Sequence, residues 1–129
     1  MNVAFTDREL DVMSVLWQRG PSTVAEVRAE LSASLAYTTV LTVLRTLEDK
    51  GYAGHEEEGK AYRYHALVAR ETAGASAIRR LMSTVFLGQP ELLLTQLVEQ
   101  RALPDSELAR LRALLDERIR ISEEEESEP

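Results

Sequence analysis

The stretch Leu35-Ala-Tyr-Thr-Thr-Val-Leu-Thr-Val-Leu-Arg-Thr-Leu-Glu-Asp-Lys-Gly51 decides the organisation of the chain. Its apolar residues recur at the i, i+3, i+4, i+7 spacing of one helix face, and they are Val40, Val43, Leu44 and Leu47. The opposite face is unusual, because threonine is a poor helix former and Ala, Glu or Lys would stabilise an exposed face better. That face carries Thr38, Thr42, Arg45 and Asp49, flanked by Thr39 and Thr46.

This polar face has the chemistry of a nucleic-acid contact. A hydroxyl reaches phosphates and base edges, a threonine methyl suits the thymine methyl, and an arginine fork suits guanine. The alternative is a solvated helix face on which the threonines are accidental. We interpret the segment from Ala36 to Lys50 as a DNA-recognition helix.

Two helices are predicted before this one. Thr6-Asp-Arg-Glu9 and Thr23-Val-Ala-Glu26 both have the capping-box pattern, Thr at the N-cap and Glu three residues later. The first helix should end at Arg19-Gly20-Pro21, after a buried stripe of Leu10, Met13, Leu16 and Trp17. Pro21-Ser-Thr23 has room for a brief edge strand. Helix, helix, tight turn and helix is the helix-turn-helix order, in which the last helix reads the major groove.

A β-hairpin is predicted directly after Gly51, because residues 52–58 and 60–67 alternate in character around Glu58-Gly59. A hairpin in this position is a wing. Its cations, Lys60 and Arg63, stand where a phosphate or minor-groove contact is expected. Ordinary surface charge paired with the glutamates at 56–58 is the alternative.

The second half of the chain is helical and rich in leucine. Helices are predicted over Arg70–Phe86, Glu91–Gln100 and Pro104–Ile121. A unit this small is marginal alone, and a second copy in a two-fold dimer would bury its apolar surface economically. Packing within one chain is the alternative. The residues expected at the dimer interface are Ile78, Leu81, Val85, Leu97, Leu108, Leu111, Leu115 and Ile119.

The predicted fold is therefore mainly α, with three domains. Residues 1–68 form an N-terminal winged helix-turn-helix of three helices plus a small β-hairpin wing. Residues 69–121 form a C-terminal helical dimerisation region. Residues 122–129 are an acidic tail without an apolar residue, which is expected to be disordered.

Composition excludes several other classes. The chain of 129 residues has no cysteine, which rules out disulfides and thiolate metal sites and fits a reducing cytoplasm. No apolar run approaches ~18 residues, so no membrane span is expected, and the N-terminus lacks the pattern of a signal peptide. The net charge of −7 argues against nonspecific nucleic-acid binding. It leaves a specific contact open, because exposed charges are screened beyond roughly 10 Å at ~0.1 M salt.

Catalysis and metal binding are not expected. The sequence has no Gly-x-Ser-x-Gly and no Gly-rich phosphate loop, and we predict neither an enzyme nor a cofactor. His55 and His65 lie near Glu56 and Glu57, which suggests a metal site. Zinc sites need three or four converging ligands, however, and two histidines on a solvated hairpin are more often surface residues.

The residues also resemble a known family. The run Leu35–Tyr52 resembles the recognition-helix region of the BlaI/MecI/CopY group of penicillinase, methicillin-resistance and copper repressors. Thr6–Trp17 resembles the first helix of that group, Gly20–Val27 its second helix and Gly59–Tyr64 its wing, and the match extends over roughly residues 5 to 120. The resemblance implies a winged-helix repressor, dimeric through its C-terminal helices and bound to palindromic operators.

Site residues follow from this resemblance residue by residue. The family's recognition-helix positions are occupied by Thr38, Thr39, Thr42 and Arg45, and its wing positions by Lys60 and Arg63. The chain lacks the C-terminal cysteine motif of the copper-responsive branch. The penicillinase branch implies a sensor protease as a partner, which cuts an Asn-Phe bond in the helical half. Gln96-Leu97 stands there in this chain, so release by proteolysis is in question.

We therefore expect a cytoplasmic, dimeric, sequence-specific repressor that binds double-stranded DNA at palindromic operators and occludes promoters. Two alternatives remain open. One is a winged-helix protein-interaction module that never touches DNA. The other is a ligand-sensing regulator with a pocket among the C-terminal helices. Steep salt dependence of DNA binding distinguishes the first alternative, and thermal stabilisation by a ligand without DNA would support the second.

Overall fold

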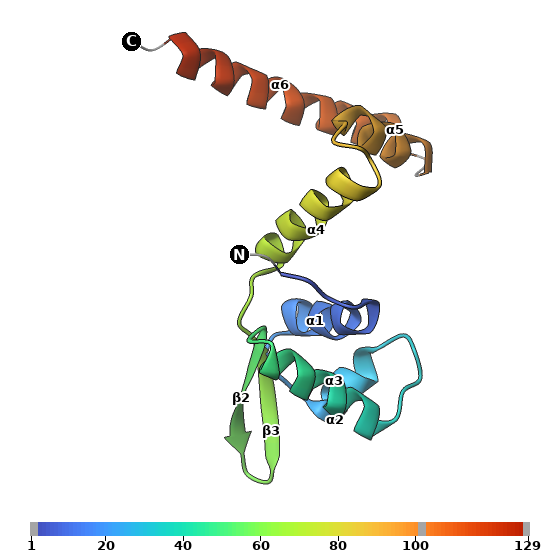
Figure 1. The fold of residues 1–129 in the computed structure, drawn as a ribbon, viewed down its shortest axis with the longest axis vertical. Helices are drawn as coiled ribbons and strands as arrows, with labels where there is room; N and C mark the ends of the chain where they lie inside the picture. Colours follow the sequence, from blue (N-terminus) through green and yellow to red (C-terminus); the bar gives the residue numbers. More distant parts are fainter. Residues whose placement is uncertain (1–2, 101–102, 128–129) are drawn as a thin grey trace. The chain divides into compact units, whose positions relative to one another are not determined.

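The structure is a computed structural model that describes residues 3–100 and 103–127 (Figure 1). The fold is mainly helical, with one small antiparallel sheet. In chain order the elements are α1 (Asp7–Arg19), β1 (Ser22–Thr23), α2 (Val24–Glu30), α3 (Tyr37–Asp49), β2 (Ala53–Glu58), β3 (Ala61–Ala66), α4 (Arg70–Thr84), α5 (Pro90–Gln100) and α6 (Asp105–Ser127).

The chain divides into two compact units, Met1–Leu81 and Met82–Pro129. The division lies inside α4, whereas the sequence placed the domain boundary between residues 68 and 69. Most of α4 stays with the first unit because Ala73 and Ser76 are buried there.

Capping boxes begin the first two helices, as predicted. In α1 the Glu9 N–H donates to Thr6 Oγ1 at 3.1 Å, and the Thr6 N–H donates to Glu9 Oε1 at 2.8 Å. Thr23 and Glu26 repeat both bonds at the start of α2. Gly20 ends α1 at φ 92°, a conformation that favours glycine. These local signals define where α1 and α2 begin and where α1 ends.

The sheet has the strand order β1-β3-β2, and all its pairings are antiparallel. Strands β2 and β3 form the predicted hairpin, and Gly59 at the turn has φ 64°. The brief strand at Ser22–Thr23 was also expected. It pairs Ser22 with Tyr64 on β3, so the wing is joined by hydrogen bonds to the segment between α1 and α2.

The core of the first unit lies among α1, α2, α3 and the inner face of the sheet. From α3 it takes Val40, Leu44 and Leu47, all fully buried, while Val43 is half-buried. The expectation for α1 was partly wrong, because Leu10 is 44 % exposed. The buried face of α1 centres on Val12, Met13 and Leu16, and Leu10 lies to one side of it; the remaining core residues are Val24, Val27, Ala53 and Tyr64.

An ion pair between the buried Glu9 carboxylate and the exposed Lys50 joins the end of α3 to α1. Glu9 is only 4 % exposed, and Lys50 Nζ approaches its two carboxylate oxygens at 2.8 and 3.0 Å. Burial acts to raise the pKa of Glu9, but hydrogen bonds from Lys50 and from the Thr6 backbone outweigh it and leave that pKa below its usual value. Glu9 therefore serves twice, in the cap of α1 and as the anchor of the residue that follows α3.

The second unit contains α5 and α6, and neither helix has a buried residue in the single chain. Helix α6 continues to Ser127, so the expectation of a disordered tail from residue 122 is wrong over 122–127. Arg120 explains part of this continuation, because it pairs with Glu117 and Glu124 at the i, i+3 and i, i+4 spacings that stabilise a helix. Over the described residues, no helix combines the length and the apolar character needed to cross a bilayer.

Candidate DNA interface

The predicted reading face lies on the exposed side of α3, opposite its core face. Thr38, Thr39, Thr42 and Arg45 are all exposed. The Thr42 hydroxyl donates to the Thr38 carbonyl at 2.9 Å, and the Thr46 hydroxyl donates to the Thr42 carbonyl at 2.9 Å. Because its proton is used inside the helix, Thr42 offers its methyl group and its oxygen lone pairs to a partner.

Arg45 adjoins the hydroxyl of Tyr64, a buried residue of β3. Burial raises the pKa of Tyr64 and the Glu48 charge adds to the rise, whereas Arg45 acts in the opposite direction by its charge and a hydrogen bond. Arg45 is therefore close enough to the wing for its charge to act on Tyr64. Tyr64 was not identified from the sequence as part of the site, although its alternation on the predicted strand was visible.

A second contact joins the end of α3 to the wing. His55 Nδ1 on β2 lies 2.7 Å from both carboxylate oxygens of Glu48. The His55 ring also stacks on Tyr62 of β3, with ring centroids 4.3 Å apart. The wing histidine is thus held against α3. Among the described residues, no group of three or more His, Cys, Asp and Glu is placed to hold a metal ion.

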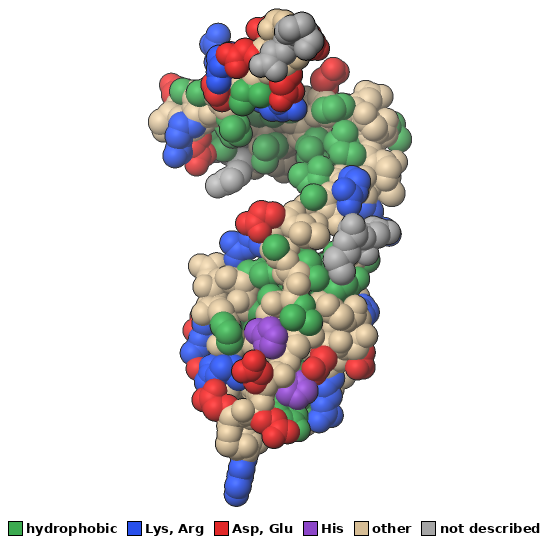
Figure 2. All heavy atoms as spheres, turned by 90° about the vertical axis from the view of Figure 1, so that its left-hand side faces the viewer, with side chains coloured by type: hydrophobic (Ala, Val, Ile, Leu, Met, Phe, Trp, Pro, Cys, Tyr) green, Lys and Arg blue, Asp and Glu red, His purple; other side chains and the backbone are tan. Residues whose placement is uncertain are grey.

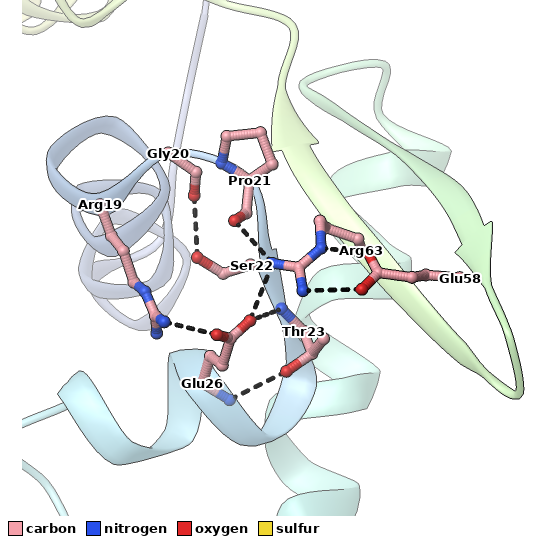
Figure 3. A network of polar contacts seen from close by, with 8 residues as sticks. All are labelled: Arg19, Gly20, Pro21, Ser22, Thr23, Glu26, Glu58 and Arg63. Atoms are coloured by element: carbon pink, nitrogen blue, oxygen red, sulfur yellow. Dashed lines mark hydrogen bonds and ion pairs between the residues drawn. The ribbon is translucent and has the colours of Figure 1, made fainter.

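The two wing cations differ in their surroundings. Lys60 is exposed at the hairpin turn and takes part in none of the ion pairs found in the described parts of the chain. Arg63 is held in the network of Figure 3: its guanidinium pairs with Glu58, and it donates to Glu26 Oε1 at 2.9 Å and to the Pro21 carbonyl at 3.1 Å. Of the two wing cations, Arg63 is therefore paired with a wing glutamate, and Lys60 takes part in no ion pair among the described residues.

Glu26 is the centre of this network. Its carboxylate accepts the Thr23 N–H of the capping box and pairs with both Arg19 and Arg63. The Thr23 bond contributes most to holding the pKa of Glu26 below its usual value, and the charges of Arg19 and Arg63 reinforce it. The end of α1, the start of α2 and the wing are thereby connected. Sequence patterns missed the link because Glu26 and Arg63 are far apart in the chain.

Arg28 is a further residue that the sequence analysis missed. Its Nε donates to the Leu35 carbonyl at 2.7 Å, which spans the turn between α2 and α3. Arg28 is exposed, and it stands in the last turn of α2. A basic residue there was a visible signal, because cations near a helix C-terminus are favourable. The bond from Arg28 stabilises the turn between α2 and α3 and so helps to position α3.

The residues predicted for a dimer interface are mostly exposed in the single chain, as Figure 2 shows for hydrophobic side chains of the second unit. Leu111 is half-buried. The exposed ones are Ile78, Leu81, Val85, Leu97, Leu108, Leu115 and Ile119. Exposed fractions reach 60 % at Val85 and 55 % at Ile119. Apart from Leu111, each of these apolar side chains is more than a third exposed in the single chain.

Comparison with known proteins gives a consistent result. The family model described as penicillinase repressor matches residues 5–117. The methicillin resistance regulatory protein MecI of Staphylococcus aureus (strain N315) is 21% identical over 112 residues, 85% of this chain and 91% of MecI. The transcriptional regulator BlaI of Mycobacterium tuberculosis (strain ATCC 25618 / H37Rv) is 43% identical over 68 residues, which is 50% of this chain and 49% of BlaI.

Among solved structures, a MarR family protein from Bacillus stearothermophilus matches 94% of this chain and 77% of its own, with 16% identity and a TM-score of 0.51. That likeness concerns the fold alone. The family match extends through both the helix-turn-helix with its wing and most of the C-terminal helices. The chain belongs to the penicillinase repressor family, a family of transcriptional repressors.

Proposed function

We propose that this chain is a dimeric, sequence-specific DNA-binding repressor that occupies palindromic operators and blocks access of polymerase to promoters. The observation that carries the proposal is the exposed threonine-and-arginine face of α3. It lies on the third helix of a winged helix-turn-helix, opposite a face that is fully buried at Val40, Leu44 and Leu47. The third helix of this arrangement is the one that enters the major groove.

The supporting chemistry follows from the side chains on that face. Thr38, Thr39 and Thr42 supply methyl groups and hydroxyl oxygens, and Arg45 supplies a fork for guanine or phosphate. The N-terminal part of α3 is nearest the bases in the proposed complex. The names of the relatives, a methicillin resistance regulatory protein and a transcriptional regulator, agree with a role in regulating transcription.

The dimer part of the proposal rests on the second unit. Contiguous exposed apolar surface on a folded chain marks an interaction site, and a two-fold partner covers it with the same surface of a second copy. Two recognition helices related by that axis would read half-sites one helical turn, or a multiple of it, apart on one face of the duplex.

Arg45→Ala is expected to weaken binding to a palindromic operator by about 1–3 kcal/mol, the range for a good base contact. Fluorescence anisotropy with a labelled operator measures this. Arg8→Ala is the matched control, because it removes an exposed arginine from α1. Unchanged operator affinity in the Arg45 variant, with the melting temperature also unchanged, would remove this residue from the reading face.

The wing cations are expected to respond differently to salt. Lys60→Ala should reduce the slope of log affinity against log salt by about 0.9, because one phosphate contact is lost. Arg63→Gln should keep the wild-type slope, since its guanidinium is neutralised by Glu58 and Glu26, and should lower the melting temperature instead. A slope reduced equally by both substitutions would place Arg63 on the DNA.

A further inference from the structure

The N-terminal segment is bound to the root of α4 by a reciprocal pair of hydrogen bonds. The Val3 N–H donates to Ser76 Oγ at 3.1 Å, and the Ser76 hydroxyl donates to the Val3 carbonyl at 2.8 Å. Val3 is 6 % exposed and Ser76 is 4 % exposed. One buried side chain therefore satisfies both backbone groups of a residue that lies seventy-three positions away. We call this pair of bonds the Val3–Ser76 latch (Figure 1 shows the segment beside the start of α4).

The segment behind the latch is attached to the winged helix itself. The Phe5 ring meets Trp17 of α1 edge-on at 6.1 Å and Tyr52 at 4.9 Å. Thr6 then caps α1. The chain between Val3 and Thr6 is therefore anchored to the helix-turn-helix on one side and to α4 on the other.

A second attachment lies at the very start of α4. Trp17 Nε1 donates to the Val68 carbonyl at 2.8 Å, and the Arg70 guanidinium lies over the Trp17 ring at 5.9 Å. The buried side chains of α4 itself are small, Ala73 and Ser76. A helix attached through its first residue alone can pivot. The latch at Ser76 holds α4 at a further point, nearly two turns after Arg70 at 3.6 residues per turn. Two points of attachment fix the direction of the helix.

We propose that Ser76 is a positioning residue that sets the direction in which α4 leaves the winged helix, and that it thereby determines which spacing of operator half-sites the dimer accepts. The inference rests on the proposed function. Helix α4 is the element that leaves the first unit, and a dimer made through the second unit transmits its direction to the recognition helix. Ser76 acts on DNA through the latch and touches no base.

The first test measures the latch without DNA. The chain has no cysteine, so Ser14→Cys on α1 and Arg79→Cys on α4 place two spin labels at exposed positions of the first unit. Labelled chains diluted with unlabelled chains report the distance between the two helices. A narrow distribution is expected, and Ser76→Ala should broaden it. Thr72→Ala, which removes an exposed hydroxyl from the same helix, should not.

The second test measures spacing preference. Full-length protein is offered palindromes in which the distance between half-sites is lengthened or shortened by about two base pairs. One turn of the duplex is roughly 10 base pairs. Wild type should bind some spacings more tightly than others. In Ser76→Ala the ratio between the strongest and the weakest of these affinities should fall about tenfold, while the affinity for a single half-site stays the same. Ser76→Thr, which keeps the hydroxyl, should retain the preference. Deletion of residues 1–4 should reproduce the effect of Ser76→Ala, since it removes the other half of the latch.

The outcomes separate the two proposals. A distance distribution that stays narrow in Ser76→Ala overturns the proposal that the latch sets the direction of α4. A broadened distribution with an unchanged spacing profile overturns its role in operator choice. Wild-type protein that fails to bind any two-site DNA refutes the proposed function and with it the role of Ser76 in spacing. The distance measurement still tests whether the latch sets the direction of α4.

Discussion

A fragment that ends at Leu81 will fold as a monomer and bind a palindromic operator roughly 10² to 10⁴-fold more weakly than the full chain, because linking two half-site contacts multiplies affinity by about that factor. The fragment keeps the whole core of the first unit, and it also keeps the Val3–Ser76 latch. Sedimentation measures the mass of the fragment, and fluorescence anisotropy measures its affinity for the operator.

A single half-site is the control for this fragment. The fragment and the full chain should bind it with similar affinity, because the reading face of α3 is present in both. Full-length protein that sediments as a monomer of 14.5 kDa at micromolar concentration would contradict the dimer. So would a fragment that binds the palindrome as tightly as the full chain.

Leu44→Ala is expected to lower the free energy of unfolding by about 2–5 kcal/mol, the range for truncating a large aliphatic side chain in a core. Leu44 is fully buried between α3 and the rest of the first unit, so the substitution leaves a cavity under α3. Urea unfolding followed by circular dichroism measures the loss. Operator affinity should fall only where the unfolded population becomes significant.

Leu10→Ala is the matched control, because it makes the same chemical change at a residue that is 44 % exposed. Its cost should be well below that of Leu44→Ala, since much of the Leu10 side chain already contacts water. Equal losses in the two variants would show that Leu44 is not central to the core.

Local chemistry made much of the fold predictable. Thr6 and Thr23 each stand three residues before a glutamate, and both capping boxes formed as the spacing indicated. The apolar spacing along α3 identified Val40, Leu44 and Leu47 as core because a helix repeats every 3.6 residues. The hairpin was visible because a glycine turn separates two runs of alternating character.

Contacts between distant parts of the chain were not predictable in the same way. No spacing rule connects Glu26 with Arg63 or Val3 with Ser76, because their pairing depends on how the helices and the sheet pack. The DNA contact predicted for the wing arginine therefore rested on its place in the hairpin and on the family resemblance, neither of which indicates its ion pairs. The prediction for the tail was wrong because its lack of apolar residues indicated disorder, whereas α6 continues to Ser127 with Arg120 paired to Glu117 and Glu124.

The engagement of Glu26 in the cap of α2 and in ion pairs with Arg19 and Arg63 restricts which substitutions this chain tolerates at position 26. Capping of α2 requires only an amide or a carboxylate at this position, because a capping box accepts either Gln or Glu. Pairing with Arg63 requires the charge. Positions 19, 26, 58 and 63 should therefore change together among related chains, with glutamine tolerated at 26 where 19 and 63 have both lost their arginines. A lineage can redesign the reading face of α3 one threonine at a time, but it can reshape the base of the wing only by coupled substitutions.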